Sequence, residues 1–394
     1  MIETENTAFQ SPVKINAGNK ALAHVPIELA AMGAERPLLI TTKALAKKRA
    51  VPKVIDGLRD SGLSLGIYDA VEEHARLKTV LDLALLFEDG GFDAIMALGS
   101  GPVMHTAKAL NVVVTEKTKE LAPFTVKGNR KIGQLKPYMA IPGTWGDGYE
   151  TTSTAFVEDL ALSSLMLMPD LVIVDPEVFV PEEPLVAISG VMAALTHAAE
   201  GFIGPGKNPF ADAYGCTAIR MIMLHFTNTL NGERGWKTAR CAVAAADTMA
   251  GCVFSNVSPG LTHRLALTIA SKTACPPGLC MGVLLPYVLD HLSMRDDFFV
   301  ESLLLPMAGP ETYAITAGEL RVGKVLTLIQ ELQFALYEAT KRELPMTLED
   351  VGIKKDQLKP MVTSMSDETR DGVNEEAILM ILERALKGDP IDFD

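Results

Sequence analysis

The sequence lacks the features that mark a nucleic-acid-binding, membrane or disulfide-rich protein. It has 36 Lys and Arg against 49 Asp and Glu, a net charge of -13, which opposes binding to nucleic acid or an anionic membrane because both require basic patches. Its five cysteines are an odd number, and their spacings match no zinc ribbon, which is typical of a reducing compartment. We therefore expect no nucleic-acid and no membrane partner.

The sequence also offers no segment that would enter a membrane. The acidic, polar segment Met1–Asn6 has neither the basic region nor the apolar run of a signal peptide. The apolar stretch from Leu160 to Val174 is interrupted by Pro169 and Asp170, and it is too short for a transmembrane helix. We expect a cytoplasmic protein.

The chain is long enough for two packed domains, with 394 residues of which 48% are hydrophobic. In its first part short apolar runs alternate with helical patterns, as in a doubly wound parallel sheet. After Pro181 long apolar-periodic stretches, such as 185–201 and 211–230, predict helices. We predict an α/β, Rossmann-like domain over residues 1–180 and an all-α domain over 181–394. Buried parallel strands are expected at 38–42, 94–98, 138–142 and 171–176.

A glycine-rich turn follows the strand expected at 94–98. Gly99-Ser100-Gly101-Pro102 ends this strand and opens a helix. Glycines let backbone amides approach a phosphate, and a helix N-terminus adds donors and the positive end of the helix dipole. Pro102 fits the first turn because the amide that it lacks is not needed there. The turn is a candidate pyrophosphate site, and a strand-to-helix turn without a ligand is the alternative.

A second glycine-rich loop follows the strand expected at 138–142. Its Thr144, Gly146 and Gly148 are candidates for holding the diphosphate or the nicotinamide side of a dinucleotide. A structured loop without a ligand is again the alternative. Two such loops after neighbouring strands indicate a dinucleotide site more strongly than either loop alone.

The order of these segments resembles the iron-containing (group III) alcohol dehydrogenase family along nearly the whole chain. Each motif is weak alone, but together they are specific. The resemblance implies a dehydroquinate synthase-like architecture and an enzyme that moves a hydride between an alcohol or aldehyde and NAD or NADP, as a homodimer or larger homo-oligomer. It rests on Gly99 to Pro102 with Ala107-Lys108, Ile141 to Glu150, Met168 to Pro176, Ala194 to Glu200, Phe254 to Asn256, Gly260 to His263, Pro276 to Gly278 and Leu284 to Pro286.

The resemblance places only two of the family's four metal ligands in this chain. The family holds a divalent metal with one aspartate and three histidines; His197 and His263 match, whereas Ala193 and Pro277 replace the aspartate and the third histidine. Residues four apart share a helix face, so an aspartate at 193 would complete half a site with His197. Neither replacement offers a lone pair, and a catalytic zinc normally needs three protein ligands. We expect an altered or lost site, with weak or no binding of iron or zinc.

Further departures from the family pattern gather around the same functions. His105 replaces the aspartate of the first loop, Leu267 replaces a further histidine, and Met281 replaces an asparagine. Thr42 replaces an acidic residue that would bind a ribose 2′-hydroxyl and repel a 2′-phosphate. Because Lys43, Lys47 and Lys48 lie nearby, NADP is expected at least as readily as NAD.

Hydride transfer without a metal would require another group to accept the alcohol proton. The candidates are His197, His263, His105 and Tyr149, and the sequence does not choose among them. The two matching histidines can instead be hydrogen-bonded core residues, and Cys275, Cys280 or Glu200 can be substitute ligands.

We predict an NAD(P)-dependent oxidoreductase of small-molecule alcohols or aldehydes. The alternative is a catalytically silent nucleotide-binding or assembly subunit on the same fold.

Overall fold

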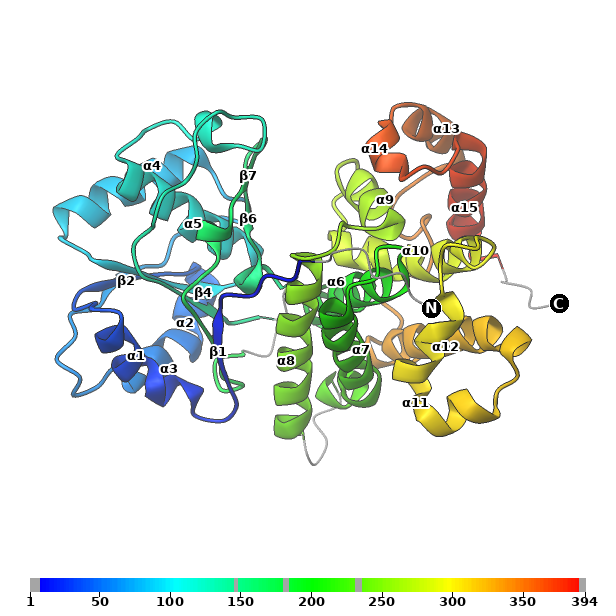
Figure 1. The fold of residues 1–394 in the computed structure, drawn as a ribbon, viewed down its shortest axis with the longest axis horizontal. Helices are drawn as coiled ribbons and strands as arrows, with labels where there is room; N and C mark the ends of the chain where they lie inside the picture. The colour runs from blue at the N-terminus through cyan, green and yellow to red at the C-terminus, as the bar shows by residue number, and fades with distance from the viewer. Residues whose placement is uncertain (1–7, 145–147, 180–183, 231–235, 390–394) are drawn as a thin grey trace. The chain divides into compact units, whose positions relative to one another are not determined.

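The computed structural model describes residues 8–144, 148–179, 184–230 and 236–389. The chain divides into two compact units (Figure 1). We call Gln10–Glu182 the α/β unit, and Glu183–Asp394 together with Ala8 and Phe9 the helical unit. This order of an α/β part and a helical part confirms the predicted fold class.

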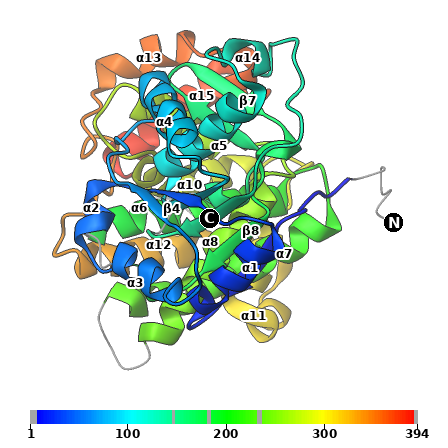
Figure 2. The ribbon, with the colours of Figure 1, turned by 90° about the vertical axis from the view of Figure 1, so that its left-hand side faces the viewer.

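The α/β unit is built on a six-stranded parallel sheet with the order β1-β8-β5-β4-β2-β3. Helices α1 to α3 lie on one side of the sheet, and α4 and α5 lie on the other (Figures 1 and 2). A separate antiparallel hairpin consists of β6 and β7. The strands are β1 (Lys14–Ala17), β2 (Pro37–Ile40), β3 (Gly66–Tyr68), β4 (Ala94–Gly99), β5 (Tyr138–Pro142), β6 (Thr154–Val157), β7 (Leu160–Ser163) and β8 (Leu171–Val174). The helices are η1 (Ala21–His24), α1 (Val25–Ala31), α2 (Lys43–Lys47), α3 (Ala50–Gly57), α4 (Leu77–Asp89), α5 (Gly101–Glu116), η2 (Ala122–Phe124), η3 (Tyr149–Thr151) and η4 (Leu165–Leu167).

The four strands that the sequence predicts are all present, as β2, β4, β5 and β8. Every residue in these strands is buried, as in strands that are covered on both faces. The carboxyl ends of neighbouring parallel strands meet at one edge, and the loops that follow β2, β4 and β5 carry the predicted cofactor residues.

The helical unit contains no strand among its described residues. Its central helix, α6, packs against α7, α8, α9 and α10. This helix is long and apolar enough to cross a membrane, but most of its residues are buried inside the unit, as in the central helix of a bundle. The helices are α6 (Pro184–Ile203), α7 (Pro209–Leu230), α8 (Trp236–Phe254), α9 (Leu261–Ala270), α10 (Pro277–Leu292), η5 (Val300–Leu303), α11 (Leu304–Ile315), η6 (Gly318–Leu320), α12 (Arg321–Ala339), α13 (Lys355–Thr363), α14 (Asp367–Arg370) and α15 (Glu375–Lys387).

Candidate functional site

The two glycine-rich loops of the α/β unit leave the sheet side by side. Strands β4 and β5 are parallel neighbours, with Gly99 opposite Pro142. The backbone N–H of Gly143 donates to the carbonyl oxygen of Gly99 at 3.2 Å, so the loops start in contact. The next residue, Thr144, is buried, and Gly148 precedes η3. Gly146 lies outside the described residues.

The first loop is a tight turn at the start of α5. Ser100 is the N-cap residue, and its carbonyl oxygen accepts hydrogen bonds from the N–H groups of Val103 and Met104, both at 3.0 Å. Gly101 and Pro102 begin the helix. A Cβ at Gly99 would lie 2.6 Å from Cγ2 of Val103, so only glycine lets the helix pack this closely onto the strand. The turn thus presents the N-terminus of a 16-residue helix at the edge of the sheet, where an anion is favoured.

Thr42 stands at the end of β2, the strand next to β4. Its hydroxyl accepts from the N–H of Leu45 at 3.3 Å and so caps α2. The hydroxyl of the preceding Thr41 donates to Leu98 O at 2.8 Å, which ties the ends of β2 and β4 together. The side chains of Lys43, Lys47 and Lys48 are exposed on α2 and just after it.

Lys108 on α5 is a structural residue of this site to which the sequence assigns no role. Its ammonium group is fully buried, and it donates to the carbonyl oxygens of Tyr149 at 2.8 Å and Thr152 at 2.6 Å. It also donates to the hydroxyl of Thr152 and the carbonyl oxygen of Thr154. These bonds fix the exit of the second loop onto α5. A lysine inside the apolar stretch 103–114 was the signal that could have revealed it.

His105, Tyr149 and Phe156 form an aromatic cluster beside this anchor. The ring centroids of His105 lie 4.3 Å from Tyr149 and 5.3 Å from Phe156, in edge-to-face contacts. Burial lowers the pKa of His105 to about 3, so its imidazole is neutral at pH 7. The structure therefore brings together the two proton-transfer candidates of the α/β unit.

The other two candidates meet in the helical unit. Nε2 of His197 on α6 and Nδ1 of His263 on α9 are hydrogen-bonded at 2.8 Å. Both rings lie against Phe254, with centroids 4.4 Å from that of His197 and 5.3 Å from that of His263. Burial lowers the pKa of His197 well below its usual value and that of His263 to about 4. Both imidazoles are neutral at pH 7.

The two positions where the family has its other metal ligands, 193 and 277, carry alanine and proline. Ala193 is buried one turn before His197 on α6, and Pro277 is the first residue of α10. Among the residues that the structure describes, no three His, Cys, Asp or Glu side chains are grouped so that they could hold a metal ion. Two imidazoles that already bond to each other do not fit an ion that requires three or four protein ligands.

Glu200 holds the two histidine-bearing helices together. It lies on α6, one turn after His197, and its Oε1 accepts from the N–H of Thr262 in the first turn of α9 at 2.6 Å. A Cβ at Gly260 would lie 2.5 Å from the Glu200 carboxyl carbon, so this close approach requires glycine. Burial raises the pKa of Glu200 to about 7. Glu200 is therefore a positioning residue for His263.

Comparison with known proteins agrees with this architecture. The model of the family "iron-containing alcohol dehydrogenase" matches residues 12–176, and the C-terminal model of the same family matches 187–386. The NADPH-dependent butanol dehydrogenase of Clostridium saccharobutylicum is 28% identical over 80% of this chain and 80% of its own. Among solved structures, a 1,3-propanediol oxidoreductase superimposes with a TM-score of 0.86 at 24% identity, covering 97% of this chain and 100% of that chain. The NAD+ complex of sulfoacetaldehyde reductase from Bifidobacterium kashiwanohense gives a TM-score of 0.85 at 18% identity, covering 98% of this chain and 100% of that chain. The chain therefore belongs to the iron-containing alcohol dehydrogenase family.

Proposed function

We propose that this chain is an NAD(P)-dependent oxidoreductase of small alcohols and aldehydes that works without a metal ion. The observation that carries the proposal is the 2.8 Å hydrogen bond between His197 and His263. A bound cation would need the lone pairs of both rings directed at itself. Here one ring nitrogen of each histidine is engaged with the other ring, and Ala193 and Pro277 supply no replacement.

The α/β unit supplies the dinucleotide site in this proposal. The turn Gly99-Ser100-Gly101-Pro102, together with Thr144, Gly146 and Gly148, holds the diphosphate. The contact between the two loops at Gly143 supports this assignment, since it places both loops at one sheet edge. The bound nicotinamide accepts or gives the hydride. Thr42 carries no charge to repel a 2′-phosphate, so NADP is accepted as well as NAD.

The helical unit supplies the proton acceptor. We assign the proton of this hydrogen bond to His263 Nδ1, so that the lone pair of His263 Nε2 takes the hydroxyl proton of an alcohol. Burial keeps both rings neutral at pH 7, so that lone pair is available. Phe254 and Glu200 hold the pair in place. Tyr149 remains a candidate catalytic residue of the α/β unit, where His105 contacts its ring at the exit of the second loop.

The test is turnover of a short aldehyde with NADPH, and of the matching alcohol with NADP, after chelator treatment and with ferrous or zinc ion added back. We expect a rate that metal does not change. His263→Gln should lower kcat by about 10²-fold or more, whereas His291→Gln, a part-buried histidine of α10, should not. A rate seen only with added metal contradicts the metal-free mechanism. NADPH binding without any turnover would support the silent-subunit alternative.

A further inference from the structure

Two cysteines flank the start of α10. Pro276 is the N-cap residue of this helix, so Cys275 occupies the position before the cap and Cys280 the fourth helical position. Side chains at these two positions characteristically pack together at a helix start. In this chain both cysteines are free thiols. The Cys275 thiol donates to the carbonyl oxygen of Pro276 at 3.7 Å, and each of the two thiols is near enough to shift the pKa of the other.

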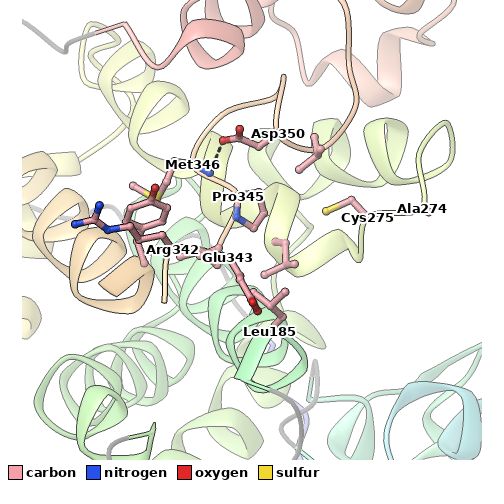
Figure 3. Close-up of a pocket in the computed structure, with 12 residues that line it drawn as sticks. Leu185, Ala274, Cys275, Arg342, Glu343, Pro345, Met346 and Asp350 are labelled. Carbon is pink, nitrogen blue, oxygen red and sulfur yellow. Dashed lines mark hydrogen bonds between the residues drawn. The ribbon is translucent and has the colours of Figure 1, made fainter. Parts of the chain in front are cut away.

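The two thiols differ in access. Cys280 is fully buried, whereas Cys275 is partly exposed. Cys275 lines a cavity of about 570 Å³ in the helical unit, opposite the loop that carries Pro345 and Met346 (Figure 3). Figure 3 shows the sulfur of Cys275 directed toward that loop. A small reagent that enters this cavity meets Cys275, whereas Cys280 is not among the residues that line the cavity.

The surroundings also give the two thiols different pKa values. The neighbouring Cys280 thiol lowers the pKa of Cys275, whereas the Cys275 thiol and burial raise the pKa of Cys280. Cys216 on α7 is another partly exposed thiol, but burial raises its pKa. Thiolate character combined with access and a neighbouring second thiol is the arrangement found at redox-sensitive cysteines.

We propose that Cys275 and Cys280 form a reversible disulfide, with Cys275 as the thiol that reacts first with a hydroperoxide. The Cys275 thiolate attacks the terminal oxygen of the hydroperoxide and becomes a sulfenic acid; the O–O bond breaks, and the rest of the peroxide takes up the thiol proton and leaves as water or an alcohol. The sulfur of Cys280 then displaces that hydroxyl as water and forms the S–S bond. Two thiols are oxidised, and one peroxide O–O bond is reduced.

The proposed disulfide would form where the start of α10 packs closely on α6. A Cβ at Gly278, between the two cysteines, would collide with the carbonyl oxygen of Ser189 on α6, so the start of α10 is seated directly on that helix. Closing the disulfide removes the free thiol from the cavity wall. It also ties Cys275, the residue before the N-cap, to Cys280 in the first turn of α10, with Pro277 between them.

The experiment treats the reduced full-length chain with hydrogen peroxide and maps its thiols by alkylation and peptide mass spectrometry. We expect a Cys275–Cys280 disulfide, seen as the loss of two hydrogen atoms and reversed by dithiothreitol. Cys275→Ser should abolish this product. Cys280→Ser should stop at the sulfenic acid, which dimedone traps, and Cys216→Ser should behave as the unchanged chain does.

Alkylation of the untreated native chain provides a test that needs no variant. We expect N-ethylmaleimide to modify Cys275 about tenfold or more faster than Cys216, and prior peroxide treatment to abolish that labelling. Two results would overturn the proposal. One is peroxide-treated chain in which both thiols remain free; the other is a peroxide product that joins different cysteines.

Discussion

The two units build their separate candidate sites from different atoms. In the α/β unit the two glycine-rich loops rely on backbone atoms: Gly99 allows the close packing of α5 on β4, and Gly143 joins the two loops through main-chain atoms. In the helical unit the site consists of side chains, and its chemistry rests on the pair His197 and His263. A backbone site withstands many substitutions because only glycines are essential to it. A side-chain site changes with one residue, as Ala193 illustrates.

The buried polar groups of the two units are stabilised in two ways. Lys108 in the α/β unit has four hydrogen-bond acceptors, and a buried charge requires such compensation. Burial favours the neutral forms of His197, His263 and Glu200 in the helical unit, as it does for His105 in the α/β unit. The first arrangement fixes a loop in place, and the second provides neutral groups for proton transfer.

Restoring the missing ligands should give the largest effect. Ala193→Asp with Pro277→His would place a carboxylate and a third imidazole beside the existing pair. We expect zinc affinity to rise by about 10³-fold, which corresponds to about 4 kcal/mol, because the set then has the donors that a catalytic zinc site requires. Metal content after purification and a zinc titration would measure it.

The control keeps the shape of the side chain introduced at position 193 and removes its negative charge. Ala193→Asn with Pro277→His should gain much less affinity, because an amide oxygen does not neutralise the cation. Equal affinity in the double variant and the unchanged chain would mean that positions 193 and 277 no longer face the histidine pair.

The sequence predicts the parts of the fold that consist of continuous apolar runs, and for this reason β2, β4, β5 and β8 were found. Strands β1 and β3 have 4 and 3 residues and are only partly buried, so neither gave a signal. Strand β7 lies inside the apolar stretch 160–174 and is not separated from it by the sequence pattern, and β6 has only four residues.

The candidate site was predictable only where it depends on local sequence. The turn at Gly99 and its helix follow from neighbouring residues. The His197–His263 and Glu200–Thr262 hydrogen bonds join residues 66 and 62 positions apart. A sequence pattern does not say which atoms of such distant side chains meet.

Glu200 should make the stability of the helical unit depend on pH. Its pKa rises from 4.5 to about 7 on folding, so the folded chain holds a proton that the unfolded chain releases. This contribution is complete below about pH 4.5 and is lost as the pH rises through 7, a change of about 3 kcal/mol. Glu200→Gln should therefore be more stable than the unchanged chain at pH 8 and similar to it at pH 4.5.

Urea unfolding at both pH values would measure this difference. The lowered pKa values of His197 and His263 make the unfolding free energy rise with pH, opposite to the effect of Glu200. The informative quantity is therefore the difference in unfolding free energy between the Glu200 variant and the unchanged chain. Glu349→Gln, at an exposed carboxylate, is the matched control and should leave the slope unchanged. A constant difference between the Glu200 variant and the parent across this range would show that Glu200 is ionised in the folded chain.

In the α/β unit the substitution Gly99→Ala tests whether the site depends on close backbone packing. The added Cβ would lie 2.6 Å from Val103, so the start of α5 has to shift. We expect a loss of about 2 kcal/mol in unfolding free energy and weaker NADPH binding, measured by urea unfolding and by fluorescence titration. Gly133→Ala, where the Cβ meets only the Glu116 carboxylate at 3.3 Å, should change both quantities little. Unchanged NADPH binding in the Gly99 variant would show that the turn at Gly99 does not bind the cofactor.

Thr42→Asp should give the smallest effect, confined to cofactor preference. Aspartate caps a helix as well as threonine does, so α2 should keep its stability. Its charge should repel a 2′-phosphate and shift the ratio of the NADPH and NADH dissociation constants about tenfold toward NADH, or about 1.4 kcal/mol. Thr42→Asn keeps the cap and the size without the charge, and its ratio should match that of the parent. If Thr42→Asp and Thr42→Asn give the same ratio of NADPH and NADH dissociation constants, the 2′-phosphate lies away from the end of β2. The exposed lysines of α2 then have no part in cofactor choice.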